Sequence, residues 1–110
     1  AGAFPLWLAP VQVKVLPVTE RAHDYATQIA AKLDAAGVRV ENDLRSEKLG
    51  YKIREAQMQK IPYMLVVGDR DMENGTVSVR TRKGDDLGAM TPDAFLSKCL
   101  MDVATKSKEV

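Results

Sequence analysis

Two arginines, one aspartate and one tyrosine carry the most specific chemistry in this sequence. Arg54 and Arg80 each present a planar guanidinium group that donates paired hydrogen bonds. Asp71 presents an acceptor for N–H groups, and Tyr51 presents an aromatic ring. Unpaired RNA bases are recognised through such contacts, by polar groups at their edges and by rings stacked on their faces. The combination favours RNA recognition.

One segment of the chain carries a local excess of positive charge. Residues 47–59 are expected to form a helix, in which apolar residues at three- and four-residue steps make an inward stripe. Ordinary ion pairs on its surface, such as Lys52 with Glu55, are an alternative explanation of the charge. The expected stripe consists of Leu49, Ile53 and Ala56. The cations in and beside the helix are Arg45, Lys48, Lys52, Arg54 and Lys60.

The overall composition is that of one small domain. The chain has 110 residues, with 16 Lys and Arg against 15 Asp and Glu and a net charge of +1. This length suits a single hydrophobic core. Its single cysteine excludes an internal disulfide and favours a reducing, cytoplasmic location. No apolar run is long enough to predict a membrane span.

Catalytic and metal-binding chemistry finds little support. His23 has no serine or cysteine nearby in the predicted fold, and Cys99 lies on the apolar side of a predicted helix, where an inert thiol is expected. One cysteine and one histidine do not make a zinc site. The acids Asp69, Asp71 and Glu73 lack a full pattern of oxygen ligands, and no phosphate-binding glycine loop is present. We therefore expect no catalytic residue, metal or cofactor in this segment.

A predicted sheet must hold the polar side chains in place. Helical crossovers join the first three expected strands, which should run parallel, and the third is apolar throughout, as in a central strand. A polar loop at residues 68–75 should lead into an antiparallel fourth strand. The expected strands are residues 11–16, 38–41, 63–67 and 76–81, with an edge strand at 86–89.

Three helices are expected around this sheet. Thr19 should cap the first, which should end at Gly37 in a left-handed conformation. Pro62 should stop the second, and Thr91 should cap the third. The fold class is therefore α/β, a mixed, mainly parallel sheet of four to five strands flanked by about three helices. The inner face of the third helix should consist of Phe95, Cys99, Leu100 and Val103.

Four stretches of the sequence resemble the C-terminal anticodon-binding domain of threonyl-tRNA synthetases, which are class II aminoacyl-tRNA synthetases. The resemblance covers nearly the whole chain. Related domains of prolyl-, histidyl- and glycyl-tRNA synthetases share parts of the second and third stretches, whereas the first and the Val-Arg-Thr-Arg strand favour the threonyl family. The stretches are residues 4–13 (FPLWLAPVQV), 43–55 (DLRSEKLGYKIRE), 61–69 (IPYMLVVGD) and 77–80 (VSVR).

The resemblance implies a site that reads the anticodon of threonine tRNA, chiefly its second and third bases, G and U. At three of the matching positions this chain has serine, lysine and aspartate, where the family more often has asparagine, arginine and glutamate. Serine is shorter than asparagine, and lysine lacks the planar fork of arginine. The two arginines are therefore the strongest candidates. The implied base-reading residues are Ser46, Arg54, Lys60, Asp71 and Arg80.

The resemblance also implies a division of labour. Residues 1–10 are expected to lead in from a catalytic domain, and residues 11–110 to form the anticodon-binding domain. ATP, threonine and zinc would belong to the catalytic domain, which would also make the full enzyme a homodimer. This segment alone should be monomeric and inactive as an enzyme. The alternatives are a borrowed fold used for protein contacts or as an accessory module, without anticodon specificity, and a small α/β enzyme or nucleotide-binding domain.

Overall fold

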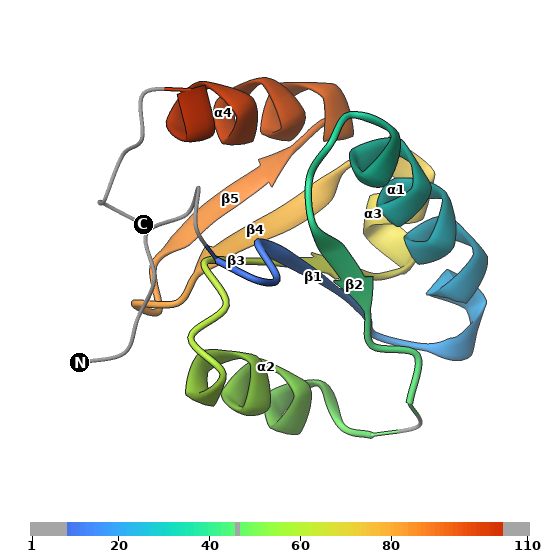
Figure 1. The fold of residues 1–110 in the computed structure, drawn as a ribbon. Helices are drawn as coiled ribbons and strands as arrows, with labels where there is room; N and C mark the ends of the chain where they lie inside the picture. The colour runs from blue at the N-terminus through green and yellow to red at the C-terminus, as the bar shows by residue number, and fades with distance from the viewer. Residues whose placement is uncertain (1–8, 46, 105–110) are drawn as a thin grey trace.

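The computed structural model describes residues 9–45 and 47–104, which form a five-stranded mixed sheet with helices on both faces (Figure 1). The strands lie in the order β2-β1-β3-β4-β5. They are β1 (Val13–Pro17), β2 (Val40–Asn42), β3 (Tyr63–Val67), β4 (Val77–Thr81) and β5 (Asp86–Met90). The helices are the 3-10 turn η2 (Glu20–Ala22), α1 (His23–Ala35), α2 (Leu49–Met58), α3 (Asp69–Asn74) and α4 (Pro92–Ala104).

The strand directions agree with the sequence. β1 pairs in parallel with both β2 and β3, whereas β4 pairs antiparallel with β3 and with β5 at the edge. The parallel pairs follow from the two helical crossovers, and the antiparallel pairs from the shorter connections. The prediction of a mixed sheet is confirmed. None of the helices described is both long and apolar enough to cross a membrane.

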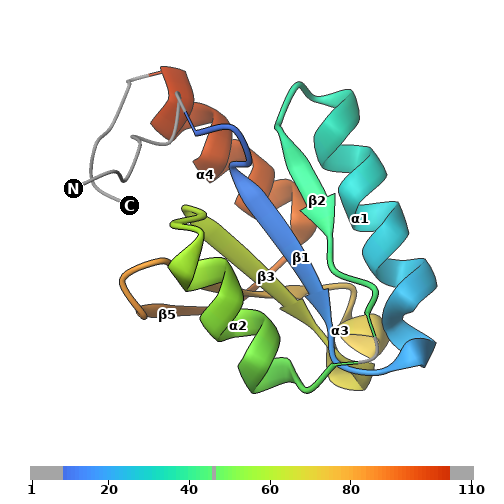
Figure 2. The ribbon, with the colours of Figure 1, turned by 60° about the horizontal axis from the view of Figure 1, so that its bottom comes forward.

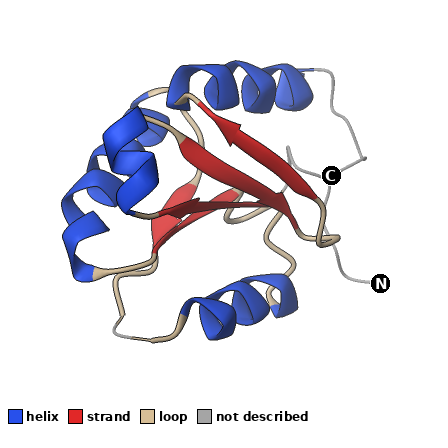
Figure 3. Cartoon of the chain, turned by 180° about the vertical axis from the view of Figure 1, so that it is seen from behind, coloured by secondary structure: helices blue, strands red, loops and turns tan. Residues whose placement is uncertain are grey.

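The sheet separates two cores, one under α1 and α4 and one under α2 (Figure 3). β3 contributes to both, because successive side chains of a strand point to opposite faces. Leu65 belongs to the larger core, where the rings of Tyr63 and Phe95 meet edge to face at 5.2 Å. Met64 packs with Ala56 of α2 in the smaller core. This double burial explains why the sequence of β3 is apolar without alternation.

The segment predicted as a polar loop forms the helix α3, so that prediction is wrong. The Asp71 carboxylate accepts a hydrogen bond from the Gly68 N–H at 3.2 Å and holds the first turn. Gly75 ends the helix in a left-handed conformation with φ of 68°. A six-residue helix stabilised by such local contacts has almost no apolar periodicity for sequence reasoning to detect.

Some predictions of helix ends and buried helix faces are confirmed, and others are wrong. Gly37 adopts the expected left-handed conformation, and the Thr91 hydroxyl accepts the expected cap bond from the Ala94 N–H. The Thr19 side chain makes no cap bond, and the 3-10 turn η2 separates Thr19 from α1. Leu100 is 40% exposed, not buried as expected, and the Val103 side chain lies outside the part that the structure describes. The inner face of α4 instead uses Phe95, Leu96 and Cys99.

Candidate nucleic-acid interface

Arg80 lies on the face of the sheet that α2 covers only in part. It stands opposite Met64 in the β3–β4 register, and paired residues of neighbouring strands project to the same face. Met64 is fully buried beneath α2, whereas the Arg80 side chain is 40% exposed. A surface contact of 3.9 Å joins the Arg80 guanidinium to the Asp86 carboxylate. Such a loose, exposed pair leaves the guanidinium available to a ligand.

The exposed side of α2 presents Arg54 within a small hollow of about 220 Å³. Tyr51 and Met58, two turns apart on the helix, are 48% and 76% exposed. The Arg45 guanidinium stacks 5.7 Å from the centre of the Tyr51 ring, and a hydrogen bond to Glu55 raises the pKa of the Tyr51 hydroxyl. An exposed ring and thioether around a guanidinium suit the face and the edge of an unpaired base. Sequence reasoning did not predict Met58 as part of this site. Its spacing of two helical turns from Tyr51 places both side chains on one side of the helix, and that spacing is the signal that could have identified it.

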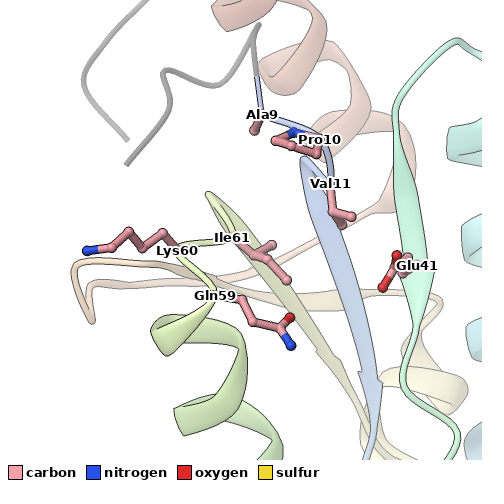
Figure 4. Close-up of a pocket in the computed structure, with 7 residues that line it drawn as sticks. All are labelled: Ala9, Pro10, Val11, Glu41, Gln59, Lys60 and Ile61. Carbon is pink, nitrogen blue, oxygen red and sulfur yellow. The ribbon is translucent and has the colours of Figure 1, made fainter. Parts of the chain in front are cut away.

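Lys60 follows the end of α2 in an unusual backbone conformation. Its φ is 59°, in the left-handed region that favours glycine. Its N–H bonds to the Gln57 carbonyl at 3.0 Å, and the Ile61 N–H bonds to the Ala56 carbonyl at 3.1 Å. This is the Schellman pattern of helix ends, with lysine at the position that glycine usually occupies. In Figure 4 the Lys60 side chain points away from a neighbouring hollow of about 300 Å³. Glu41 lines the opposite side of this hollow.

Asp71 is largely buried, and its carboxylate is engaged within the fold. Besides the Gly68 N–H, it accepts a hydrogen bond from the Thr76 hydroxyl at 2.9 Å and a weaker one from the Ser78 hydroxyl at 3.4 Å. These bonds tie α3 to the start of β4. Ser78 lies two residues before Arg80, so the side chains of Ser78 and Arg80 project to the same face of β4. The base-reading role of Asp71 stays a prediction, and Ser46 lies outside the described residues.

Two cations of the basic segment serve the fold. Lys52 is 2% exposed, and its ammonium donates to the carbonyls of Asp43 at 3.0 Å and Pro17 at 3.3 Å. The suggested pair of Lys52 with Glu55 is therefore wrong. Arg45 instead bridges the carboxylates of Asp43 at 2.7 Å and Glu55 at 2.6 Å.

The Arg45 bridge has electrostatic consequences. The hydrogen bond from Arg45 lowers the pKa of Asp43 below its ordinary value, against the opposing effect of burial. A second bond lowers the pKa of Glu55 in the same way. Both carboxylates are therefore held ionised. Among the side chains that the structure describes, no three of His, Cys, Asp or Glu gather as metal ligands.

The sequence profile described as "Anticodon binding domain" matches residues 12–101. The chain belongs to the anticodon binding domain family. This anticodon binding domain is 62% identical, over 96% of its length, to the threonine–tRNA ligase of Syntrophomonas wolfei, and 59% identical, over 97%, to that of Caldanaerobacter subterraneus. It spans only 16% and 17% of those ligases.

A solved structure gives the same result for the fold of the domain. The crystal structure of the RNA binding domain of threonyl-tRNA synthetase from Cryptosporidium parvum matches with a TM-score of 0.86 and 30% identity. The match covers 91% of this chain and 25% of that one. The expected resemblance and fold are thereby confirmed.

Proposed function

We propose that this domain reads the anticodon of threonine tRNA within a threonine–tRNA ligase. The observation that carries the proposal is the placement of Arg54 and Arg80 on α2 and on the sheet face that α2 leaves partly open. Both guanidinium groups are held on regular elements of the fold. A rigid support matters because base readout depends on hydrogen-bond geometry. The family and its ligase relatives support the assignment.

Each proposed contact follows from the chemistry of its side chain. Arg80 and Arg54 donate to base edges, and the exposed Tyr51 ring supports a base face. Lys60 supplies charge without a planar fork. Asp71 would accept a base N–H only through an oxygen lone pair left over from its bonds within the fold. Ser46 would add a hydroxyl, and the bases read would be G and U, the second and third of the anticodon.

The whole protein would attach threonine to its tRNA. In that arrangement the domain supplies tRNA recognition, and a catalytic domain of the same chain supplies the ATP, threonine and zinc chemistry and the homodimer contact. The 110-residue chain alone would be monomeric and catalytically inactive, and the full enzyme would work in the cytoplasm. Formation of threonyl-adenylate by the chain alone would contradict this division.

The deciding experiment compares three RNA hairpins at two salt concentrations. One is the threonine anticodon stem-loop, and the others replace its second or third anticodon base. Salt weakens the electrostatic attraction to every hairpin, so only base readout makes the replaced hairpins bind worse at the same salt. We expect a clear preference for the parent hairpin. Equal binding to all three would instead favour a borrowed fold without anticodon specificity.

A further inference from the structure

We propose that Arg45 positions the Tyr51 ring as a preformed stacking platform for an unpaired RNA base. The Cζ atom of the Arg45 guanidinium lies 5.7 Å from the centre of the ring, within the range of a cation–π contact. The ring is 48% exposed and lines the hollow of about 220 Å³ on α2. Arg45 is not among the described residues that line this hollow, which are Tyr51, Arg54, Glu55 and Met58. The guanidinium therefore supports the ring from one side and leaves another side open to a ligand.

A buried carboxylate fixes Arg45 in this place. The Nε and Nη2 atoms of Arg45 donate to the two oxygens of Asp43 at 2.8 and 2.7 Å, in the two-pronged arrangement of strong arginine–carboxylate pairs. Asp43 is 3% exposed, and its N–H donates to the Val15 carbonyl of β1 at 2.9 Å. Figure 2 shows the chain leaving β2 and passing beyond the carboxyl end of β1 before it enters α2. The guanidinium is thus tied to the sheet.

A second carboxylate connects Arg45 to the far end of the ring. The Nη2 atom of Arg45 donates to the Oε1 atom of Glu55 at 2.6 Å. Glu55 follows Tyr51 by one helical turn, and its hydrogen bond with the Tyr51 hydroxyl raises the pKa of that hydroxyl. Arg45 therefore holds the face of the ring directly and holds its hydroxyl by way of Glu55. Two contacts on different parts of one side chain select a single orientation of the ring.

The same bonds make Arg45 a poor ligand for a phosphate. Its Nε and Nη2 atoms serve Asp43, and its Nη1 atom also points to Glu55, at 3.4 Å. Both carboxylates have lowered pKa values and are held ionised. A cation between two ionised carboxylates attracts an anion only weakly, because their charges oppose its own. The geometry therefore favours a support for the ring over a contact with the RNA backbone.

A ring that is already held binds a base better than a free ring does. An exposed tyrosine samples several rotamers, and the loss of that freedom on binding opposes association. Arg45 restricts the Tyr51 ring before the RNA arrives, so less freedom is lost. Every base has a face that can stack on an aromatic ring, so the platform adds affinity without selecting a base. The inference rests on the proposed anticodon reading, in which Arg54 and Arg80 supply the selection.

Side-chain NMR of the 110-residue chain without RNA tests the positioning directly. Coupling constants report whether the χ1 angle of Tyr51 occupies one rotamer or averages over several. We expect one rotamer in the parent chain. In Arg45→Gln, which removes both the planar fork and the charge, the rotamers should average. An averaged ring in the parent, or a single rotamer that persists in Arg45→Gln, would overturn the inference.

Hairpin binding at pH 7 shows whether Arg45 acts through the ring. We expect Tyr51→Ala to weaken binding of all hairpins about tenfold, as for a lost base stack. Arg45→Gln should weaken it about threefold to tenfold, as for a side chain that must be ordered on binding. The double variant should bind no more weakly than Tyr51→Ala alone, because no ring is left to position. Losses that multiply in the double variant would show that Arg45 acts independently of the ring, contrary to the proposal.

Two further variants separate positioning from charge. Arg45→Lys keeps a cation beside the buried Asp43, so it tests the inference even if Arg45→Gln is less stable. It loses the planar fork and should bind nearly as weakly as Arg45→Gln. The slope of log affinity against log salt in both variants should equal that of Lys32→Gln, the matched control, which removes one charge from an exposed ion pair on α1. Full rescue by lysine, or a slope shallower by about 1 in Arg45→Gln, would make Arg45 a phosphate contact instead.

The outcomes distinguish the two proposals. Arg45→Gln should keep the base preference of the parent chain while it loses affinity, since the platform selects no base. An unchanged affinity in Arg45→Gln would defeat the positioning role and leave anticodon reading intact. Equal binding of the parent chain to all hairpins would defeat anticodon reading. The rotamer of Tyr51 and the double variant of Arg45 and Tyr51 would still decide whether Arg45 positions the ring.

Discussion

The cations at the two ends of the parallel strands have different roles in the structure. Beyond the carboxyl ends of β1 and β2, Lys52 and Arg45 bind carbonyls and carboxylates of the chain itself. Beyond the opposite end of β3, Lys60 and Lys83 line an open hollow. The cations at the two ends are of similar residue types. The presence or absence of nearby acceptor oxygens within the fold therefore decides which cations stabilise the fold and which can bind a ligand.

The largest expected effect tests the first group. Lys52→Met keeps most of the side-chain volume but removes the donor to the carbonyls of Pro17 and Asp43. We expect the free energy of unfolding to fall by about 2–4 kcal/mol, because buried acceptors without partners are costly. Urea titration measures it. The exposed Lys48→Met on the same segment should change stability by at most about 0.5 kcal/mol. Equal stability of the two variants would show that Lys52 has no structural role.

The next effect separates base readout from general charge. Arg80→Ala should weaken binding of the threonine anticodon hairpin by about 1–3 kcal/mol and flatten the preference among hairpins. Direct binding titrations measure both quantities. Asp86→Asn is the control, because it removes the loose Arg80 to Asp86 contact but keeps the guanidinium. A retained base preference in Arg80→Ala would reassign Arg80 to the RNA backbone.

The smallest effect concerns acid stability. Arg45 lowers the pKa of Asp43 in the folded chain, so the stabilisation is complete above the unfolded value of about 3.8 and is lost as the pH falls through the folded value. Arg45→Lys keeps the charge but loses the two-pronged bond, and the pKa of Asp43 should rise. Acid unfolding should then begin at higher pH. Urea titrations from pH 7 to pH 2 measure it, and an unchanged acid profile would contradict the role of this bond.

Sequence reasoning predicted the helix and the strand that carry the site but not all of the residues in it. Arg54 and Arg80 were predicted on regular elements, and the structure places them there. Arg82 and Lys83 were not predicted as site residues, since nothing in their own neighbourhood indicates that the end of α2 lies beside them. Helix α3 was missed because its stabilising bonds come from single polar groups, Asp71 above all.

The sequence by itself determined the type of most elements and the direction of the first four strands. Alternation, apolar runs and helical spacing are local patterns, and short connections leave few ways to join such elements. Only the tertiary structure decided the role of each charge. The Lys52 ammonium meets the Pro17 carbonyl 35 positions away, and the Lys60 carbonyl meets Arg82 22 positions away. Such contacts depend on packing across the whole domain, so no local pattern in the sequence reveals them.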